Sequence, residues 1–172
     1  GEWVFGCDLC QDVCPWSVKA ARRTARPPDE LWRPQAERAR PDLLRWLKLS
    51  DEALGETLLG SPLRRAFPRG LKRNALIVLA NQRYVDALPS MWSLLEHPDL
   101  GVRVSAVWAI TTLTLELARR DEISVDALRA FGETLRARVQ TRLEDGALVS
   151  PEIELCDELR WADEELRRVL AL

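Results

Sequence analysis

The sequence predicts an all-α protein. From about residue 41 onward, apolar residues recur every three or four positions, which is the spacing that places them on one face of a helix. No stretch alternates apolar and polar residues between hairpin turns, as half-buried strands do. Serine, proline and glycine residues fall where the helical patterns begin and end. With 172 residues and 47% hydrophobic content, the chain is long enough to bury the core of one or two small domains.

Three of the four cysteines lie near the N-terminus, in the run Gly6-Cys-Asp-Leu-Cys-Gln-Asp-Val-Cys-Pro-Trp16. The spacing C-x-x-C-x-x-x-C-P is the second half of the bacterial ferredoxin pattern, in which the cysteine before proline ligates a different cluster from its neighbours. A residue before proline is also held out of the helical region. We therefore expect Cys7 and Cys10 to donate to one [4Fe–4S] cluster and Cys14 to another, and residues 1–24 to form a partial ferredoxin-like segment.

This cysteine pattern has two other known uses. A structural zinc site needs four ligands, and the only other candidates, Cys156 and His97, lie far along the chain. A redox-active dithiol would use Cys7 and Cys10 but would leave Cys14 and its proline unexplained. Iron–sulfur ligation accounts for all of these positions and is favoured. Cys156 falls on an apolar helical stripe and is most simply a buried hydrophobic residue, whereas His97 precedes a proline and is expected in a turn.

Residues 25–40 form a proline-containing linker, and a series of short helices follows it. Ser50 and Ser61 are placed to cap helices, and Pro68 is expected to break one. From the apolar spacing and these boundary residues, helices are predicted over 42–49, 51–60, 62–67, 71–81, 86–96 and 100–119.

A weak internal repeat relates the last of these helices to an earlier one. Shifting the sequence by 31 residues places Lys72 on Arg103 and Ala75 on Ala106, with apolar residues matched further along. Small residues at matched positions let paired helices approach closely, as stacked helical hairpins require. The predicted fold is therefore a HEAT-like helical repeat array over residues 41–120, preceded by the partial ferredoxin-like iron–sulfur segment.

Residues 121–172 are predicted to add a C-terminal helical extension of two long helices. Ser124 can cap the first, which should end near Gly146, and the run Ser150-Pro151 opens the second. Each has an apolar stripe, so we expect the pair to pack on the repeat array. No uninterrupted apolar run approaches about 18 residues, so no membrane-spanning segment is expected.

Charge is distributed unevenly along the chain, although the net charge is only −2. Residues 15–73 carry 14 Lys/Arg and 7 Asp/Glu, whereas residues 74–172 carry 11 and 17. The densest basic stretch, Ser61–Arg73, contains no acidic residue. Such a stretch is either a solvated face or a surface for a polyanion. The candidate nucleic-acid contacts are Arg64, Arg65, Arg69, Lys72, Arg73 and Asn74, the last with an equally good alternative role in packing.

The cysteine run, followed by Leu43-Leu-Arg-Trp-Leu47, Gly60-Ser-Pro-Leu-Arg-Arg-Ala66 and Gly70-Leu-Lys-Arg-Asn-Ala75, resembles the C-terminal part of epoxyqueuosine reductase. The resemblance implies a cobalamin-dependent enzyme with two [4Fe–4S] clusters that reduces the epoxide of epoxyqueuosine in tRNA. It also implies that a HEAT-like domain helps to hold the tRNA near its anticodon. Ser17 stands where the family usually has asparagine, a departure that is not expected to affect a ligand.

The resemblance covers about residues 3–115 and lacks the half of the family that holds cobalamin and the catalytic acid. No catalytic residue is therefore assigned, and the chain alone, which begins at Gly1, is expected to be an inactive fragment. The expected whole is a cytoplasmic, monomeric oxidoreductase with a separate electron donor. The alternatives are a stand-alone iron–sulfur electron carrier and a HEAT-like scaffold that binds proteins.

Overall fold

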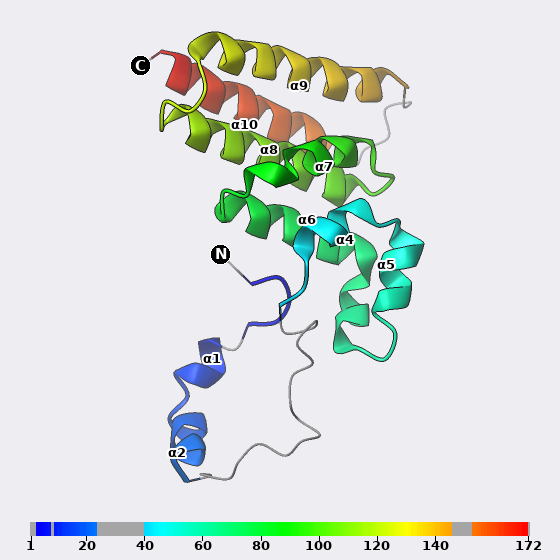
Figure 1. Ribbon diagram of the computed structural model, residues 1–172, viewed down its shortest axis with the longest axis vertical. Coiled ribbons are helices and arrows are strands. Elements are labelled where there is room, and N and C mark those ends of the chain that lie inside the picture. Colours follow the sequence, from blue (N-terminus) through cyan, green and yellow to red (C-terminus); the bar gives the residue numbers. More distant parts are fainter. Residues whose placement is uncertain (1–2, 8, 24–39, 146–152, 172) are drawn as a thin grey trace. The chain divides into compact units, whose positions relative to one another are not determined.

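The computed structural model describes residues 3–7, 9–23, 40–145 and 153–171, and the chain divides into two compact units (Figure 1). The smaller unit is Phe5–Asp42, and the larger comprises Gly1–Val4 and Leu43–Leu172. Every regular element among the described residues is helical, which confirms the predicted all-α class.

The described residues of the smaller unit include two short helices, α1 (Leu9–Asp12) and α2 (Pro15–Arg23). Pro15 opens α2, where its missing N–H leaves no hydrogen bond unmade. Most of the predicted linker over 25–40 lies outside the described residues.

The described part of the larger unit is built from helices (Figure 1). In chain order these are α4 (Leu43–Lys48), α5 (Asp51–Thr57), η2 (Pro62–Ala66), α6 (Phe67–Asn81), η3 (Val85–Ala87), α7 (Leu88–Ser93), η4 (Leu94–Glu96), α8 (Leu100–Ala118), α9 (Val125–Asp145) and α10 (Ile153–Leu170), those labelled η being 3₁₀ helices.

Three predicted N-caps are confirmed by their hydrogen bonds. The Ser50 hydroxyl accepts from the backbone N–H of Ala53 at 3.1 Å, which begins α5. Ser61 accepts from Leu63 at 3.2 Å and begins η2. Ser124 precedes α9, and its hydroxyl accepts from the backbone N–H of Ala127 at 3.1 Å. Each side chain satisfies a backbone donor that the first helical turn leaves free.

Two predicted helix boundaries were wrong. Pro68 does not break a helix, because α6 begins at Phe67 and places the proline within its first turn, where proline is tolerated. The single helix expected over 86–96 is instead divided into η3, α7 and η4. Tertiary packing decides such changes between α and 3₁₀ turns, and the spacing of apolar residues does not reveal them.

The core of the larger unit lies where α6 packs against α8. Ala75 and Ala106, which the repeat matches to each other, are fully buried there, and so is Ala109. Small side chains let the two helix backbones approach closely. The packing supports the predicted pairing of these helices, while the HEAT assignment itself stays a prediction.

Helix α8 is long and apolar enough in composition to cross a membrane, which was not expected from the sequence. More than half of its most apolar window is buried inside the helical unit, as is usual for the central helix of a folded domain. Helix α10 packs against both α8 and α9, and Figure 1 shows it between them. The C-terminal extension is therefore part of the same compact unit as the helices before it.

Candidate cluster segment and nucleic-acid interface

The three motif cysteines occupy the accessible part of the smaller unit. Cys7 and Cys10 are exposed, Cys14 is half-buried, and all three thiols are free. Cys10 lies on α1, whereas Cys14 lies between α1 and α2, directly before the helix that Pro15 opens. The pre-proline residue is thus outside a helix, as its position predicts.

Helix α2 polarises Cys14. The backbone N–H groups of Ser17 and Trp16, in the first turn of α2, donate hydrogen bonds to its sulfur, and the Ser17 side chain adds another. These bonds favour the thiolate and lower the pKa of Cys14 below its ordinary value. The thiolate is the form that ligates metals, so the local structure suits Cys14 to that role. Ser17 was not expected to affect a ligand, but it hydrogen-bonds to Cys14, which is a predicted ligand.

The described residues do not complete a metal site. No group of three or more His, Cys, Asp or Glu side chains converges among them to hold a metal ion. Cys156 is half-buried on α10, as its place on an apolar stripe predicted. The free thiols of Cys7, Cys10 and Cys14 are soft donors of the kind that iron–sulfur clusters require. They supply only part of the ligand set of such a centre.

The predicted basic contacts separate into an exposed group and a buried group. Arg64 and Arg65 are exposed on η2, and neither has an ion-pair partner among the described residues. Arg69 and Arg73 are exposed on α6. Arg69 is held loosely, 3.8 Å from Asp99. The exposed arginines thus gather at η2 and the beginning of α6.

Lys72 and Asn74 are directed elsewhere. The side chain of Lys72 is only 4% exposed, and its Nζ donates to Asp51 Oδ1 at 2.6 Å. It is therefore not available to a phosphate, and we remove it from the candidate contacts. The amide of Asn74 donates to the backbone carbonyl of Val4 at 2.8 Å. This bond fits the packing role and fixes the chain just before the cysteine run to α6.

Asp51 joins three segments of the larger unit. Besides Lys72, its Oδ1 lies 3.2 Å from His97 Nε2, and His97 Nδ1 accepts from the Asp99 backbone N–H at 3.0 Å. Burial alone would raise the pKa of Asp51, but the hydrogen bonds and charges of Lys72 and His97 outweigh it and lower that pKa below its ordinary value. His97 lies in a turn, as predicted, but it is buried and ties that turn to α5.

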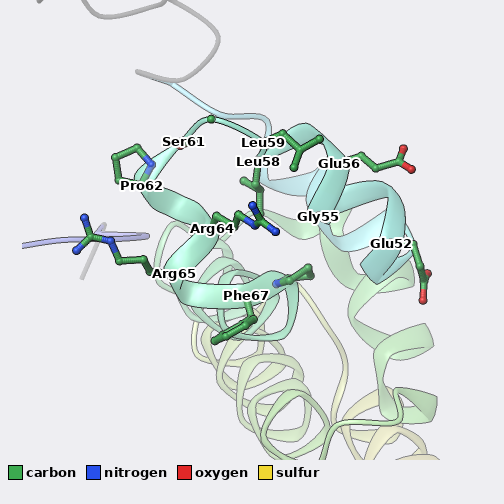
Figure 2. Close-up of a pocket in the computed structure, with 12 residues that line it drawn as sticks. Glu52, Gly55, Glu56, Leu58, Leu59, Ser61, Pro62, Arg64, Arg65 and Phe67 are labelled. Carbon is green, nitrogen blue, oxygen red and sulfur yellow. The ribbon is translucent and has the colours of Figure 1, made fainter.

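A groove lies beside the exposed arginines, between α5 and the η2–α6 junction (Figure 2). Its volume is about 980 Å³, within the range of about 300–1,000 Å³ typical of ligand sites. Leu59 and Phe67 are 57% and 59% exposed within it. Neither residue was singled out from the sequence, and the only signal was a phenylalanine inside an otherwise basic run.

The larger unit is thus an all-α domain with an arginine-lined groove, and the chain also carries a segment of cluster-type cysteines. No family model matches it. The epoxyqueuosine reductase of Staphylococcus aureus (strain NCTC 8325) is 31% identical over 149 residues, which is 85% of this chain and 36% of that protein. That of Cellulophaga algicola is 38% identical over 79 residues, 42% of this chain and 22% of that protein.

Solved structures agree in fold. A crystal structure of epoxyqueuosine reductase with an epoxyqueuosine-modified tRNA-Tyr stem loop matches 95% of this chain and 37% of its own, with a TM-score of 0.65 and 23% identity. A structure of the Bacillus subtilis enzyme matches 93% and 38%, with a TM-score of 0.63 and 23% identity. The chain is therefore related to one part of the epoxyqueuosine reductases, as its motifs predicted.

The matches span between 22% and 38% of the length of these four proteins. The match to the Staphylococcus aureus enzyme nevertheless includes 85% of this chain, too much to fall within residues 1–120 alone. The similarity to the family therefore extends beyond residues 3–115, the part over which the motifs carry the resemblance.

Proposed function

We propose that this chain is the part of an epoxyqueuosine reductase that supplies cluster ligands and a binding surface for tRNA. The whole enzyme would reduce epoxyqueuosine to queuosine in tRNA and would depend on cobalamin and two [4Fe–4S] clusters. The observation that carries the proposal is the joint presence, in one chain, of the C-x-x-C-x-x-x-C-P segment and a helical unit, with relatives of that name aligned over most of the chain.

In this proposal the three cysteines have separate tasks. Cys7 and Cys10 would hold one cluster and Cys14 the other, and bound clusters supply one-electron transfer. The accessible thiols and the lowered pKa of Cys14 support this assignment. Cobalamin is proposed only for the remainder of the enzyme, and no residue of this chain is assigned to it. The enzyme would be a cytoplasmic monomer that receives electrons from a separate donor.

The exposed arginines would hold the phosphate backbone of the tRNA. Arg64, Arg65 and Arg73 have no acidic partner among the described residues, so their charges are available to phosphates. Clustered cations gain affinity for nucleic acid mainly by releasing condensed counterions. A strong dependence of binding affinity on salt concentration would therefore distinguish an RNA-binding surface from a protein-binding scaffold.

A salt titration tests the tRNA surface. The 172-residue chain should bind an anticodon stem-loop RNA with an affinity that falls as salt rises, measured by fluorescence anisotropy at several ionic strengths. Replacing Arg64, Arg65 and Arg73 with alanine should reduce the slope of log K against log salt by about one unit for each phosphate that the variant no longer neutralises. Replacing Arg129 and Arg160, which pair with acids on their own helices, should change it little. Equal slopes for all proteins would favour the protein-binding scaffold instead.

A further inference from the structure

Phe67 adopts a backbone conformation that bulky residues rarely take. Its φ is 56° and its ψ is 157°, close to a region populated almost only by glycine. Its N–H donates to the Arg64 carbonyl, closing η2, and the next residue continues into α6. A strained conformation costs free energy and points to a functional reason for it. Here the ring stays 59% exposed at the edge of the groove instead of joining the core.

The groove has an apolar lining and charged ends. Leu58 is buried beneath it, while Leu59 is exposed within it. Figure 2 shows the side chain of Arg64 between η2 and α5, whereas the carboxylates of Glu52 and Glu56 point away from it beyond α5 and the Arg65 side chain points away on the opposite side. A ligand that fits must therefore carry a flat or apolar body and a negative group near Arg64.

The Phe67 ring already takes part in one stacked contact. The guanidinium carbon of Arg69 lies 5.4 Å from its centroid, a cation–π arrangement. Proteins recognise unpaired bases by stacking them on aromatic rings and on arginine planes, beside cations that hold the phosphates. Phe67, Arg64 and Arg69 supply these three elements within one short stretch of chain.

We propose that this groove binds one unpaired nucleotide of an RNA. Its base stacks on Phe67, and its phosphate lies at Arg64. The inference rests on the proposed RNA-binding function and adds to it a preference for an unpaired base.

Phe67→Gly in the 172-residue chain tests the stacking contact. Glycine suits the backbone conformation at this position, so the variant removes the ring without adding strain. Fluorescence anisotropy would compare an anticodon stem-loop RNA with a fully paired duplex of equal length. We expect Phe67→Gly to weaken stem-loop binding on the order of 5- to 150-fold, the range that loss of one base–aromatic stack produces, with the salt slope unchanged. Tyr84→Ala, which removes an exposed aromatic side chain outside the groove, is the matched control.

Each outcome has a separate meaning. Loss of stem-loop binding in Phe67→Gly, with duplex binding unchanged, supports the nucleotide site. Equal binding of stem-loop and duplex, unaffected by Phe67→Gly but dependent on salt, overturns the nucleotide site and leaves the proposed RNA-binding function standing. Absence of binding to every RNA by the wild-type chain overturns both and favours a protein partner.

Discussion

Lys72 shows how the surroundings of a single residue set its role. Its ammonium is enclosed by helices and neutralised by Asp51, which also contacts His97. A buried cation is tolerated only when a partner offsets its lost hydration. Lys72, Asp51 and His97 therefore link α6, the first residue of α5 and the turn before α8. By sequence Lys72 belongs to the basic stretch, but in the structure it belongs to the core.

Asp51→Asn tests this link. The variant keeps the shape of the side chain and removes the charge that faces buried Lys72. We expect a loss of about 2 kcal/mol in the free energy of unfolding at pH 7, below the ~3–5 kcal/mol for breaking a fully buried pair, because the Asp51 side chain is 34% exposed. Urea denaturation followed by circular dichroism measures it. Asp126→Asn, at a side chain that is 95% exposed, is the control.

The difference in folding stability between the wild type and Asp51→Asn should also depend on pH. Since folding lowers the pKa of Asp51, its stabilising effect is complete above the ordinary carboxyl range and is lost as the pH falls through the lowered pKa. The stability difference between wild type and Asp51→Asn should therefore shrink in acid. A difference that stays constant between neutral and acidic pH would show that the charge of Asp51 is not what stabilises the link.

At the scale of the helix, the contact between α6 and α8 depends on small residues. Ala75, Ala106 and Ala109 are fully buried, and larger residues such as Ile110 fill the space around them. Protein cores are packed at nearly crystalline density, so the separation of the two helices is set by these alanines. The 31-residue repeat matched Ala75 to Ala106 because the same packing requirement recurs in both helices.

Ala106→Leu should overpack this contact. The added atoms have no cavity to enter, and we expect a destabilisation of about 1–3 kcal/mol in thermal or urea unfolding. Ala130→Leu makes the same change on the exposed face of α9 and should cost less than about 0.5 kcal/mol. Equal losses in the two variants would mean that Ala106 lies in a looser environment than its burial indicates.

At the scale of the whole molecule, the cysteine segment and the helical unit differ in what they need. The helical unit has a continuous core that requires no metal. In the proposed assignment, the cysteine segment offers at most two thiolates to one cluster and one to the other, fewer than the four ligands of a [4Fe–4S] cluster. The fragment alone should therefore fold its helices, hold no stable cluster and have no reductase activity.

Two cysteine variants test the division of ligands. In the complete reductase, reconstituted without oxygen, two clusters correspond to about eight irons. Cys7→Ala and Cys14→Ala should damage different clusters, and electron paramagnetic resonance distinguishes them. Cys156→Ala, a change on α10 away from the motif, is the control. Identical spectral losses in the Cys7 and Cys14 variants would contradict the assignment of these residues to separate clusters.

Sequence alone predicted the helical class, the caps at Ser50, Ser61 and Ser124, and the resemblance to epoxyqueuosine reductase. These features depend on residues close together in the chain: apolar spacing, hydroxyls before a first turn and cysteines at fixed intervals. Local signals of this kind are complete within a few residues, which is why they can be read without a structure.

Only the tertiary structure decided which basic residues face the solvent and what lies beside them. Lys72 and Arg73 are neighbours in sequence, yet successive residues on a helix point about 100° apart, and so one is buried and the other exposed. The groove is lined by residues of α5 and of the start of α6, which are separate in sequence. Phe67, with its positive φ, lies at its edge. Pairing, burial and strain depend on contacts between distant segments, and these exist only once the chain is folded.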